Sequence, residues 1–324
     1  MSNSFSFLPF TENDYQSHLS PREGEARIGE KLCKDTEHSG LRYVILGIEE
    51  SFGPMANSGG DGSQNAFKAF LTRFLNMQAN EHLDAGNTAI LGRITTKATY
   101  QDQLSARELI VELDDLVSEI LTPYFKRGVI PIVIGGGHNN AYPIIRAAYQ
   151  ASHQPLSIVN LDPHADTRAL EGRHSGNPFS YAIEDGYIQN YIVLGLHKAY
   201  NNQYILDLLR TNNYFHTYFE DYLAEPSRFT TDIDAVIEKF TTSRALGVEL
   251  DLDSIAFMPS SAFTPSGFSV NDARYYIRRM ALMSNVKYLH LPEAAPQTEQ
   301  DVKIVGKTLA YLVWDFLSVR NNPF

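Results

Sequence analysis

The sequence predicts an α/β protein in which a central, mostly parallel sheet lies between two layers of helices. Short apolar runs of strand length alternate with longer segments whose apolar residues follow helical spacing. Strands that alternate with helices are typical of a parallel sheet covered on both faces. No Pro/Gly/Ser-rich linker and no block of charge interrupts the 324 residues. We therefore expect a single domain over residues 1–324, although the length alone would allow two.

The predicted strands are short apolar runs. They cover residues 42–48, 87–94, 129–134, 156–161, 191–196, 245–250 and 286–291. Two long helices are predicted from apolar residues that recur every three or four positions. The first covers residues 102–127 and ends at Gly128. The second covers residues 299–320, where Trp314 falls one position off the apolar stripe and is expected at the edge of the core or in a subunit contact.

The composition is typical of a soluble enzyme and excludes some other classes. With 43% apolar residues the chain can bury a large core, and its net charge of −11 argues against nucleic acid as a partner. No apolar run reaches 18 residues, so no membrane span is expected. The first residues lack the features of a signal peptide, and the single Cys33 suits a reducing compartment. We therefore expect a cytoplasmic protein.

Three polar segments follow predicted strands directly. They are Gly135-Gly136-Gly137-His138, Asp162-Pro163-His164-Ala165-Asp166 and Asp251-Leu252-Asp253. In a parallel α/β sheet, functional residues lie at the carboxyl ends of the strands, so the three segments should open onto one edge. In an extended chain, residues i, i+2 and i+4 point the same way, so the side chains within each segment should converge.

These segments supply four carboxylates and two imidazoles to one place. The candidate metal ligands are His138, Asp162, His164, Asp166, Asp251 and Asp253. Clustered carboxylates repel one another unless cations are present, and two divalent ions would match the four negative charges. Oxygen ligands with two imidazoles and no thiolate favour Mn first, with Ni, Co, Fe or Zn possible. Taken alone, the segment Asp162-Pro163-His164-Ala165-Asp166 could equally be an ordinary polar strand end.

With these motifs, the chain from about Tyr43 onward resembles the ureohydrolase family of arginase, agmatinase and formimidoylglutamase. The resemblance implies an arginase-like three-layer α/β/α fold and two metal sites. One ion would be bound by His138, Asp162, Asp166 and Asp251, and the other by Asp162, His164, Asp251 and Asp253. Asp162 and Asp251 would bridge the ions, with a water or hydroxide between them.

Two further segments are candidates for chemistry. In Arg173-His174-Ser175-Gly176-Asn177-Pro178-Phe179, the family carries a substrate loop, so Ser175 and Asn177 are candidate substrate contacts. His174 is a candidate general acid, because an imidazole titrates near neutrality, but it could also be an exposed loop residue. The Gly- and Asn-rich loop that includes Asn57 and Asn65 resembles the rim of the family's site, and could equally be a plain flexible loop.

Glu293 follows the last predicted strand and aligns with a glutamate of the family. A carboxylate there could accept two N–H bonds from a planar amidine, although a solvated turn glutamate is the alternative. Asp166 is a candidate proton acceptor as well as a metal ligand, and Asp253 is the alternative. Arg168 or Arg173 could bind a substrate carboxylate or could neutralise nearby acidic residues.

Within the family, several residues favour formimidoylglutamase. Gly137 replaces an Asp of arginase and agmatinase, and Ser175 to Phe179 and Arg168 follow the formimidoylglutamase pattern. Glu249, by contrast, replaces a small residue of the family.

We therefore expect a binuclear-metal enzyme that hydrolyses N-formimidoyl-L-glutamate to L-glutamate and formamide, a step of histidine breakdown. The alternatives are another ureohydrolase, acting on agmatine, arginine or a guanidino acid, and a non-catalytic metal-binding homologue. The expected partners are a small amidine and further copies of the chain in a homo-oligomer, with no nucleic acid and no membrane.

Overall fold

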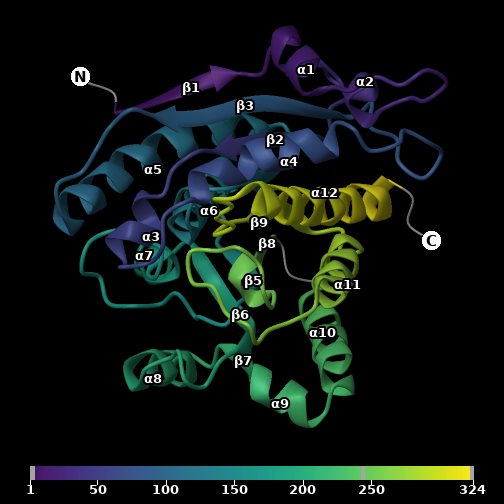
Figure 1. Cartoon of the computed structure of the whole chain (residues 1–324). Helices are drawn as coiled ribbons and strands as arrows, with labels where there is room; N and C mark the ends of the chain where they lie inside the picture. The colour runs from purple at the N-terminus through teal and green to yellow at the C-terminus, as the bar shows by residue number, and fades with distance from the viewer. Residues whose placement is uncertain (1–3, 242–244, 322–324) are drawn as a thin grey trace.

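The computed structural model describes residues 4–241 and 245–321, which form one large sheet between two helical layers (Figure 1). The nine strands lie in the order β1-β3-β2-β4-β9-β8-β5-β6-β7. Only β1 is antiparallel to its neighbour; the other described pairs are parallel. The strands are β1 (Phe5–Pro9), β2 (Tyr43–Ile48), β3 (Thr88–Thr96), β4 (Ile130–Ile134), β5 (Leu156–Leu161), β6 (Ile188–Leu196), β7 (Phe215–Tyr218), β8 (Leu246–Leu250) and β9 (Val286–Leu291).

Each face of the sheet is covered by its own set of helices. On one face the core includes side chains from α1 (Glu12–His18), α2 (Ile28–Lys31), α4 (Ala66–Phe74), α9 (Phe219–Ala224), α10 (Ser227–Phe240), α11 (Val270–Ala281) and α12 (Glu299–Asn321). On the other face it includes side chains from α3 (Phe52–Ala56), α5 (Gln103–Lys126), α6 (Ala141–Ser152), α7 (Pro178–Glu184) and α8 (Gln203–Thr211). The predicted three-layer α/β/α architecture is confirmed.

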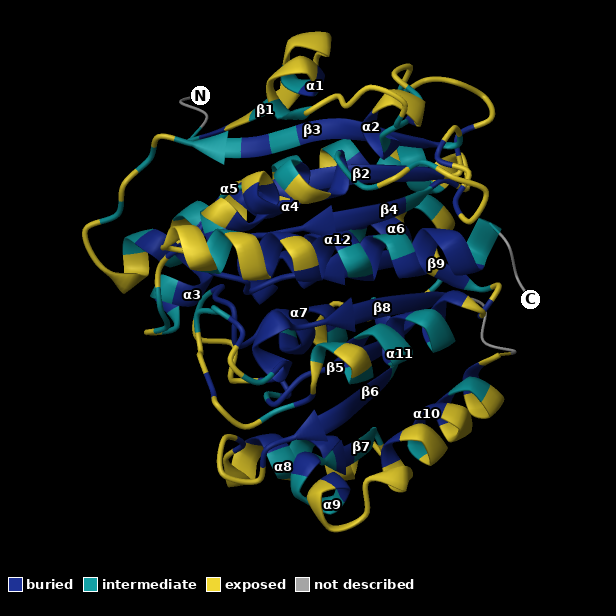
Figure 2. Cartoon of the chain, turned by 45° about the vertical axis from the view of Figure 1, so that its right-hand side comes forward, coloured by how far each residue is buried: buried dark blue, intermediate teal, exposed yellow. Residues whose placement is uncertain are grey.

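The apolar runs of the central strands are continuous because both faces of these strands are covered by helices. In β5, Ile158 packs into one helical layer while its neighbour Val159 packs into the other, because successive side chains point to opposite faces. Both faces of the central strands are therefore buried, whereas the helices are exposed on their outer sides (Figure 2).

The predicted elements agree with the structure to within a few residues. The first long helix begins after the N-cap Asp102, whose side chain accepts a bond from the Ser105 amide, and Gly128 follows its end with φ 74°. The edge strands β1 and β7 and most of the shorter helices were not predicted. β7 has only four residues, and three of them are partly buried, so it carries little of the apolar signal that marks the central strands.

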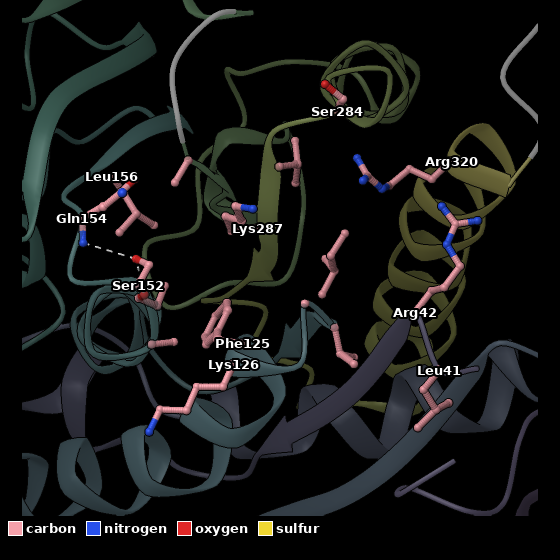
Figure 3. A pocket seen from close by; sticks show the side chains of 17 residues that line it. Leu41, Arg42, Phe125, Lys126, Ser152, Gln154, Leu156, Ser284, Lys287 and Arg320 are labelled. Atoms are coloured by element: carbon pink, nitrogen blue, oxygen red, sulfur yellow. Dashed lines mark hydrogen bonds between the residues drawn. The ribbon is translucent and has the colours of Figure 1, made fainter. Parts of the chain in front are cut away.

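The strands that carry the predicted site residues are neighbours. His138, Glu293, Asp251 and Asp162 follow β4, β9, β8 and β5, which lie side by side in that order at the centre of the sheet. At the opposite, amino-terminal edge of these strands there is a cavity of about 450 Å³, whose lining includes Arg42, Lys287 and Arg320 (Figure 3). It contains none of the predicted site residues. Among the described residues, no helix is both long and apolar enough to cross a membrane.

Candidate metal centre

The loop after β4 can hold His138 in place only because glycines precede it. Gly135 and Gly136 have φ of 86° and 67°, in the left-handed region that favours glycine. A Cβ on Gly137 would lie 2.3 Å from Pro54 Cδ, so the aspartate of arginase would not fit here. The Gly137 amide donates to the buried carboxylate of Glu50 at 2.8 Å, which fixes the loop.

His138 is fully buried and faces the aspartates. Its Nδ1 lies 2.9 Å from Asp166 Oδ2, 2.9 Å from Asp251 Oδ2 and 3.2 Å from Asp162 Oδ2. The four residues are those that the resemblance assigns to the first ion, and their ligand atoms lie within reach of a single cation.

A second group shares Asp162 with the first. His164 Nδ1 lies 3.3 Å from Asp253 Oδ2 and 3.6 Å from Asp162 Oδ1, and these three residues form a ligand cluster of their own. Asp162 therefore faces both clusters through its two oxygens. Asp251, the other predicted bridge, is part of the first cluster only.

The side chains converge, but the expected reason is wrong. The predicted alternation required an extended chain beyond each strand. Instead, Asp166 has φ 47°, and Asp253 lies in the 3-10 turn Leu252–Ser254. Backbone amides in these turns donate back to carboxylates, from His164 to Asp162 Oδ1 at 2.6 Å and from Asp253 to Asp251 Oδ1 at 2.8 Å. Tight turns, not pleating, bring the ligands together.

The protonation behaviour of the cluster fits cation binding. Burial, followed by the charges of Asp253 and Asp162, raises the pKa of Asp251 well above its usual value. Burial likewise raises the pKa of Asp253 to about 6, although His164 opposes this. His138 Nδ1, His138 Nε2 and Asp253 Oδ1 are buried without a hydrogen-bond partner. Carboxylates that cannot all ionise together, beside unsatisfied imidazole nitrogens, form a donor set suited to two divalent ions.

The two clusters open onto a cavity of about 310 Å³. Its lining includes Asp166, His164, Asp251 and Asp253 on the metal side, and the Gly- and Asn-rich loop that includes Asn57 on the other. That loop was expected at the rim of the site, and the structure places Asn57 there.

Glu293 also lines this cavity, and it is almost fully buried. The His138 amide donates to its Oε1 at 2.6 Å, and the Ser261 hydroxyl donates to its Oε2. Burial, then the charge of Asp251, raises the pKa of Glu293 to about 8. Its φ of 70° is one that non-glycine residues rarely adopt. Glu293 is thus not a solvated turn residue.

Arg168 and Ser175 are the other predicted residues in the lining. Arg168 is exposed at the cavity, while the Ser175 hydroxyl accepts a bond from Asn57 Nδ2 at 3.3 Å. Both are therefore placed where a substrate could touch them.

His174, Asn177 and Arg173 do not line the cavity. His174 is not an exposed loop residue, since it is fully buried, and its Nδ1 accepts a bond from the Gly176 amide at 3.1 Å. Burial and then the charge of Arg107 lower its pKa to about 4, so the ring is neutral at pH 7. The general-acid role that we expected of His174 has no support from this placement.

Asn177 and Arg173 stabilise the loop instead. The side-chain Nδ2 of Asn177 donates to the carbonyl oxygens of Gly172 at 2.8 Å and Ala169 at 3.1 Å. Arg173 is buried against Asp114, with 2.9 Å between Nε and Oδ2, so it is not free to bind a substrate carboxylate.

Sequence reasoning missed several residues of the cavity, among them Tyr200, Asn201 and Ser261. Tyr200 and Asn201 lie in the loop after β6, a strand whose end the sequence also marks as a candidate rim of the site, but through His197, which does not line the cavity. The Tyr200 ring stacks on the metal-ligand candidate His164, with 5.3 Å between ring centroids. Ser261 lies in a long loop after β8, and no sequence pattern pointed to it.

Comparison with known proteins agrees with this geometry. The sequence model of the arginase family matches residues 42–318. The chain belongs to the arginase family. It is 27% identical over 290 residues to a formimidoylglutamase of Macrococcus caseolyticus, covering 86% of this chain and 85% of the relative. The resemblance seen in the sequence is thereby confirmed.

Solved structures share the fold. A Trypanosoma cruzi formiminoglutamase with Mn2+ superposes with a TM-score of 0.75 at 22% identity, covering 92% of this chain and all of that one (100%). A formimidoylglutamase from Bacillus subtilis superposes with a TM-score of 0.76 at 16% identity, covering 94% of this chain and 96% of that one. At these identities the likeness establishes the arginase-family fold.

Proposed function

We propose that this chain is a binuclear-metal hydrolase of linear amidines that converts N-formimidoyl-L-glutamate and water to L-glutamate and formamide. The observation that supports it most is the pair of ligand clusters sharing Asp162 on one side of a cavity that also holds Glu293 and Arg168. Curated relatives named formimidoylglutamase, 27% identical over most of both chains, support the choice of substrate.

The first cluster would hold one divalent ion and the second the other, and Mn is the first choice. A carboxylate-rich set with two imidazoles suits Mn, and a related structure contains Mn2+. Bound there, such ions would lower the pKa of a water molecule toward neutrality and supply a nucleophile.

Glu293 orients the substrate. A carboxylate at the cavity wall, held from behind by an amide and a hydroxyl, can accept N–H bonds from a cationic amidine and fix its carbon toward the aspartates. Asp166 lines the same cavity and accepts the proton that the attacking water loses. The proton then passes to the leaving glutamate nitrogen, and the C–N bond breaks to release formamide.

Arg168 gives the substrate preference. Its exposed guanidinium at the cavity can pair with a carboxylate of the glutamate portion. Agmatine has no carboxylate and would gain nothing from this contact. A cytoplasmic location, a role in histidine breakdown and a homo-oligomeric state stay predictions.

The test is a substrate panel. The purified protein, loaded with Mn2+, is given N-formimidoyl-L-glutamate, agmatine, arginine and a guanidino acid, and released formamide, urea and ammonia are measured. We expect the highest kcat/KM for N-formimidoyl-L-glutamate. A preference for agmatine or arginine would overturn the substrate while leaving amidine hydrolysis in place, and no turnover with any of them would support the non-catalytic alternative.

A further inference from the structure

We propose that Glu249, a residue outside both metal clusters, is a positioning residue that orients the imidazole of His138. The inference rests on the metal centre of the proposed function, but not on the identity of the substrate. Glu249 is not part of the Asp251-Leu252-Asp253 ligand motif. It is a fully buried residue of β8, two positions before Asp251.

The chemistry of His138 requires a partner behind its ring. Nδ1 faces three carboxylate oxygens at 2.9 to 3.2 Å, so this nitrogen is the one that would bind a cation. A neutral imidazole that ligates through Nδ1 carries its proton on Nε2, and metal-bound histidines donate that proton to an acceptor that fixes the ring. Here Nε2 is buried away from bulk water, so we look for the acceptor among the neighbouring side chains.

Glu249 is placed to be that acceptor. Its Oε2 lies 3.5 Å from His138 Nε2, on the side of the ring away from the aspartates. A typical N–H···O bond is about 3.0 Å long, so the contact should shorten once a cation at Nδ1 fixes the proton on Nε2.

The Glu249 carboxylate is itself fixed from two sides. The Tyr288 hydroxyl donates to Oε1 at 2.6 Å, and His290 Nδ1 lies 2.6 Å from Oε2. Tyr288 and His290 are two residues apart on β9, and His290 is the register partner of Glu249 in the parallel pair β8–β9. A carboxylate oxygen has two lone pairs, so Oε2 can accept from His290 and from His138 together.

The length of the Glu249 side chain matters for this contact. A small side chain at position 249 could not reach His138 Nε2 from β8. Burying a carboxylate costs free energy unless it is fully hydrogen-bonded. For Glu249, tighter metal binding through His138 would offset part of that cost.

The same residues allow one competing interpretation. Ligand atoms of His138, Glu249 and His290 lie within 4.8 Å of one another and could hold an ion of their own. In that case Nε2 of His138 would be a ligand instead of a donor. The two interpretations differ in stoichiometry, with two ions per chain in the first and three in the second.

The test measures metal binding without substrate. Metal-free protein and Glu249→Gln are titrated with Mn2+ by calorimetry, and bound metal is counted by elemental analysis. We expect two ions in the parent, and in the variant one of the two weakened by about 10- to 100-fold, the range for loss of a residue that orients a ligand. Asp315→Asn is the matched control, because Asp315 is also a buried carboxylate, paired with Arg274 and Arg278 away from the site. It should lose stability while binding both ions normally.

Tyr288→Phe keeps the inference testable if Glu249→Gln does not fold. It leaves the carboxylate in place and removes one of its two supports, so we expect a few-fold loss of affinity for the same ion. Parent-like affinity for both ions in the two variants, or three ions in the parent, would overturn the role. Failure to hydrolyse N-formimidoyl-L-glutamate with metal binding as described would overturn the proposed function alone.

Discussion

Glu293 offers the clearest separation of substrate binding from metal binding at the scale of single residues. Both of its oxygens accept from fixed donors, the His138 amide and the Ser261 hydroxyl. Divalent ions at the neighbouring aspartates would offset the charge of Asp251 and favour the ionised form of Glu293. Glu293→Gln removes the charge that favours a cationic amidine, so we expect kcat/KM to fall by about 100-fold. Both metals should remain bound, because Glu293 belongs to neither cluster. Kinetics and metal content measured on the same sample check this.

The control for Glu293 is Ser261→Ala, which removes one donor but keeps the carboxylate, and it should cost less activity. Parent-like activity in Glu293→Gln would mean that Glu293 has only a structural role in its turn, and that another group binds the amidine.

Arg168 should affect one substrate class and not another. Because its side chain is exposed, we expect Arg168→Ala to raise KM for N-formimidoyl-L-glutamate by about tenfold, or about 1.4 kcal/mol, with little change in kcat. KM for agmatine should stay the same. Arg22→Ala, which removes an exposed arginine paired with Glu25, is the control. An equal rise in KM for both substrates would show that Arg168 shapes the loop and does not bind a carboxylate.

His174 should appear in the pH dependence of stability. Its pKa is lowered to about 4 in the folded chain, by burial and then by Arg107, from a usual value of 6.5. The unfolded chain therefore binds a proton that the folded chain does not, and the free energy of unfolding falls as pH drops from about 6.5 toward 4. In His174→Gln this part of the decline should be lost, as measured by urea unfolding at pH 7.5 and pH 5.

His153→Gln, which changes an exposed histidine, should keep the parent's pH dependence. If His174→Gln declines with pH as steeply as the parent, the ring is already able to protonate in the folded chain, and a proton-donor role returns to consideration.

His174 shows which properties of a single residue can be predicted from the sequence and which cannot. The metal ligands were found because strand ends mark them and because their chemistry recurs within a few positions. The lowered pKa of His174 depends on its burial and on the charge of Arg107 from α5, which is far away in the sequence. No local pattern contains that information.

At the scale of elements, α12 and α4 approach closely at Gly306. A Cβ on Gly306 would lie 2.3 Å from the carbonyl oxygen of Ala69. Gly306→Ala should therefore push the helices apart and lower the free energy of unfolding by about 1–3 kcal/mol, the range for overpacking a core. Lys307→Ala, at the exposed neighbouring position, should change it little. Urea midpoints of the two variants and the parent decide between tight packing and a helix that shifts freely.

The elements were predictable where burial on both faces made a strand uniformly apolar, as in β2, β5 and β8. They were missed where an element is short or has few buried residues. The amphipathic helix α10 has four buried residues among fourteen, and it was left unassigned, although Phe229, Ile233, Val236 and Phe240 follow helical spacing. The turns after β5 and β8 are the most consequential of these gaps, since they and not strand pleating aim the aspartates.

At the scale of the whole molecule, metal and fold should stabilise each other. A ligand that binds only the folded chain adds about 2.7 kcal/mol at 100 times its Kd. We therefore expect chelation to lower Tm together with activity, and Mn2+ to restore both. Asp251→Ala removes an oxygen beside His138 and should weaken the response of Tm to Mn2+ without abolishing it, because the second cluster keeps its own ligands. Elemental analysis that finds two ions in Asp251→Ala would contradict the ligand assignment.

The position of β9 has a consequence for how the chain matures. β9 lies between β4 and β8, although it is the last strand to be synthesised. Until it inserts, the sheet consists of two separate halves, with His138 on one and the aspartates on the other, and His138 and Glu293 are 155 residues apart along the chain. A ribosome-bound chain that ends before residue 286 would therefore carry every metal-ligand candidate and still lack the first cluster, because His138 and its aspartates lie on different halves. We therefore expect the first ion to bind only after β9 has joined the two halves of the sheet, whereas the second cluster follows the paired strands β5 and β8.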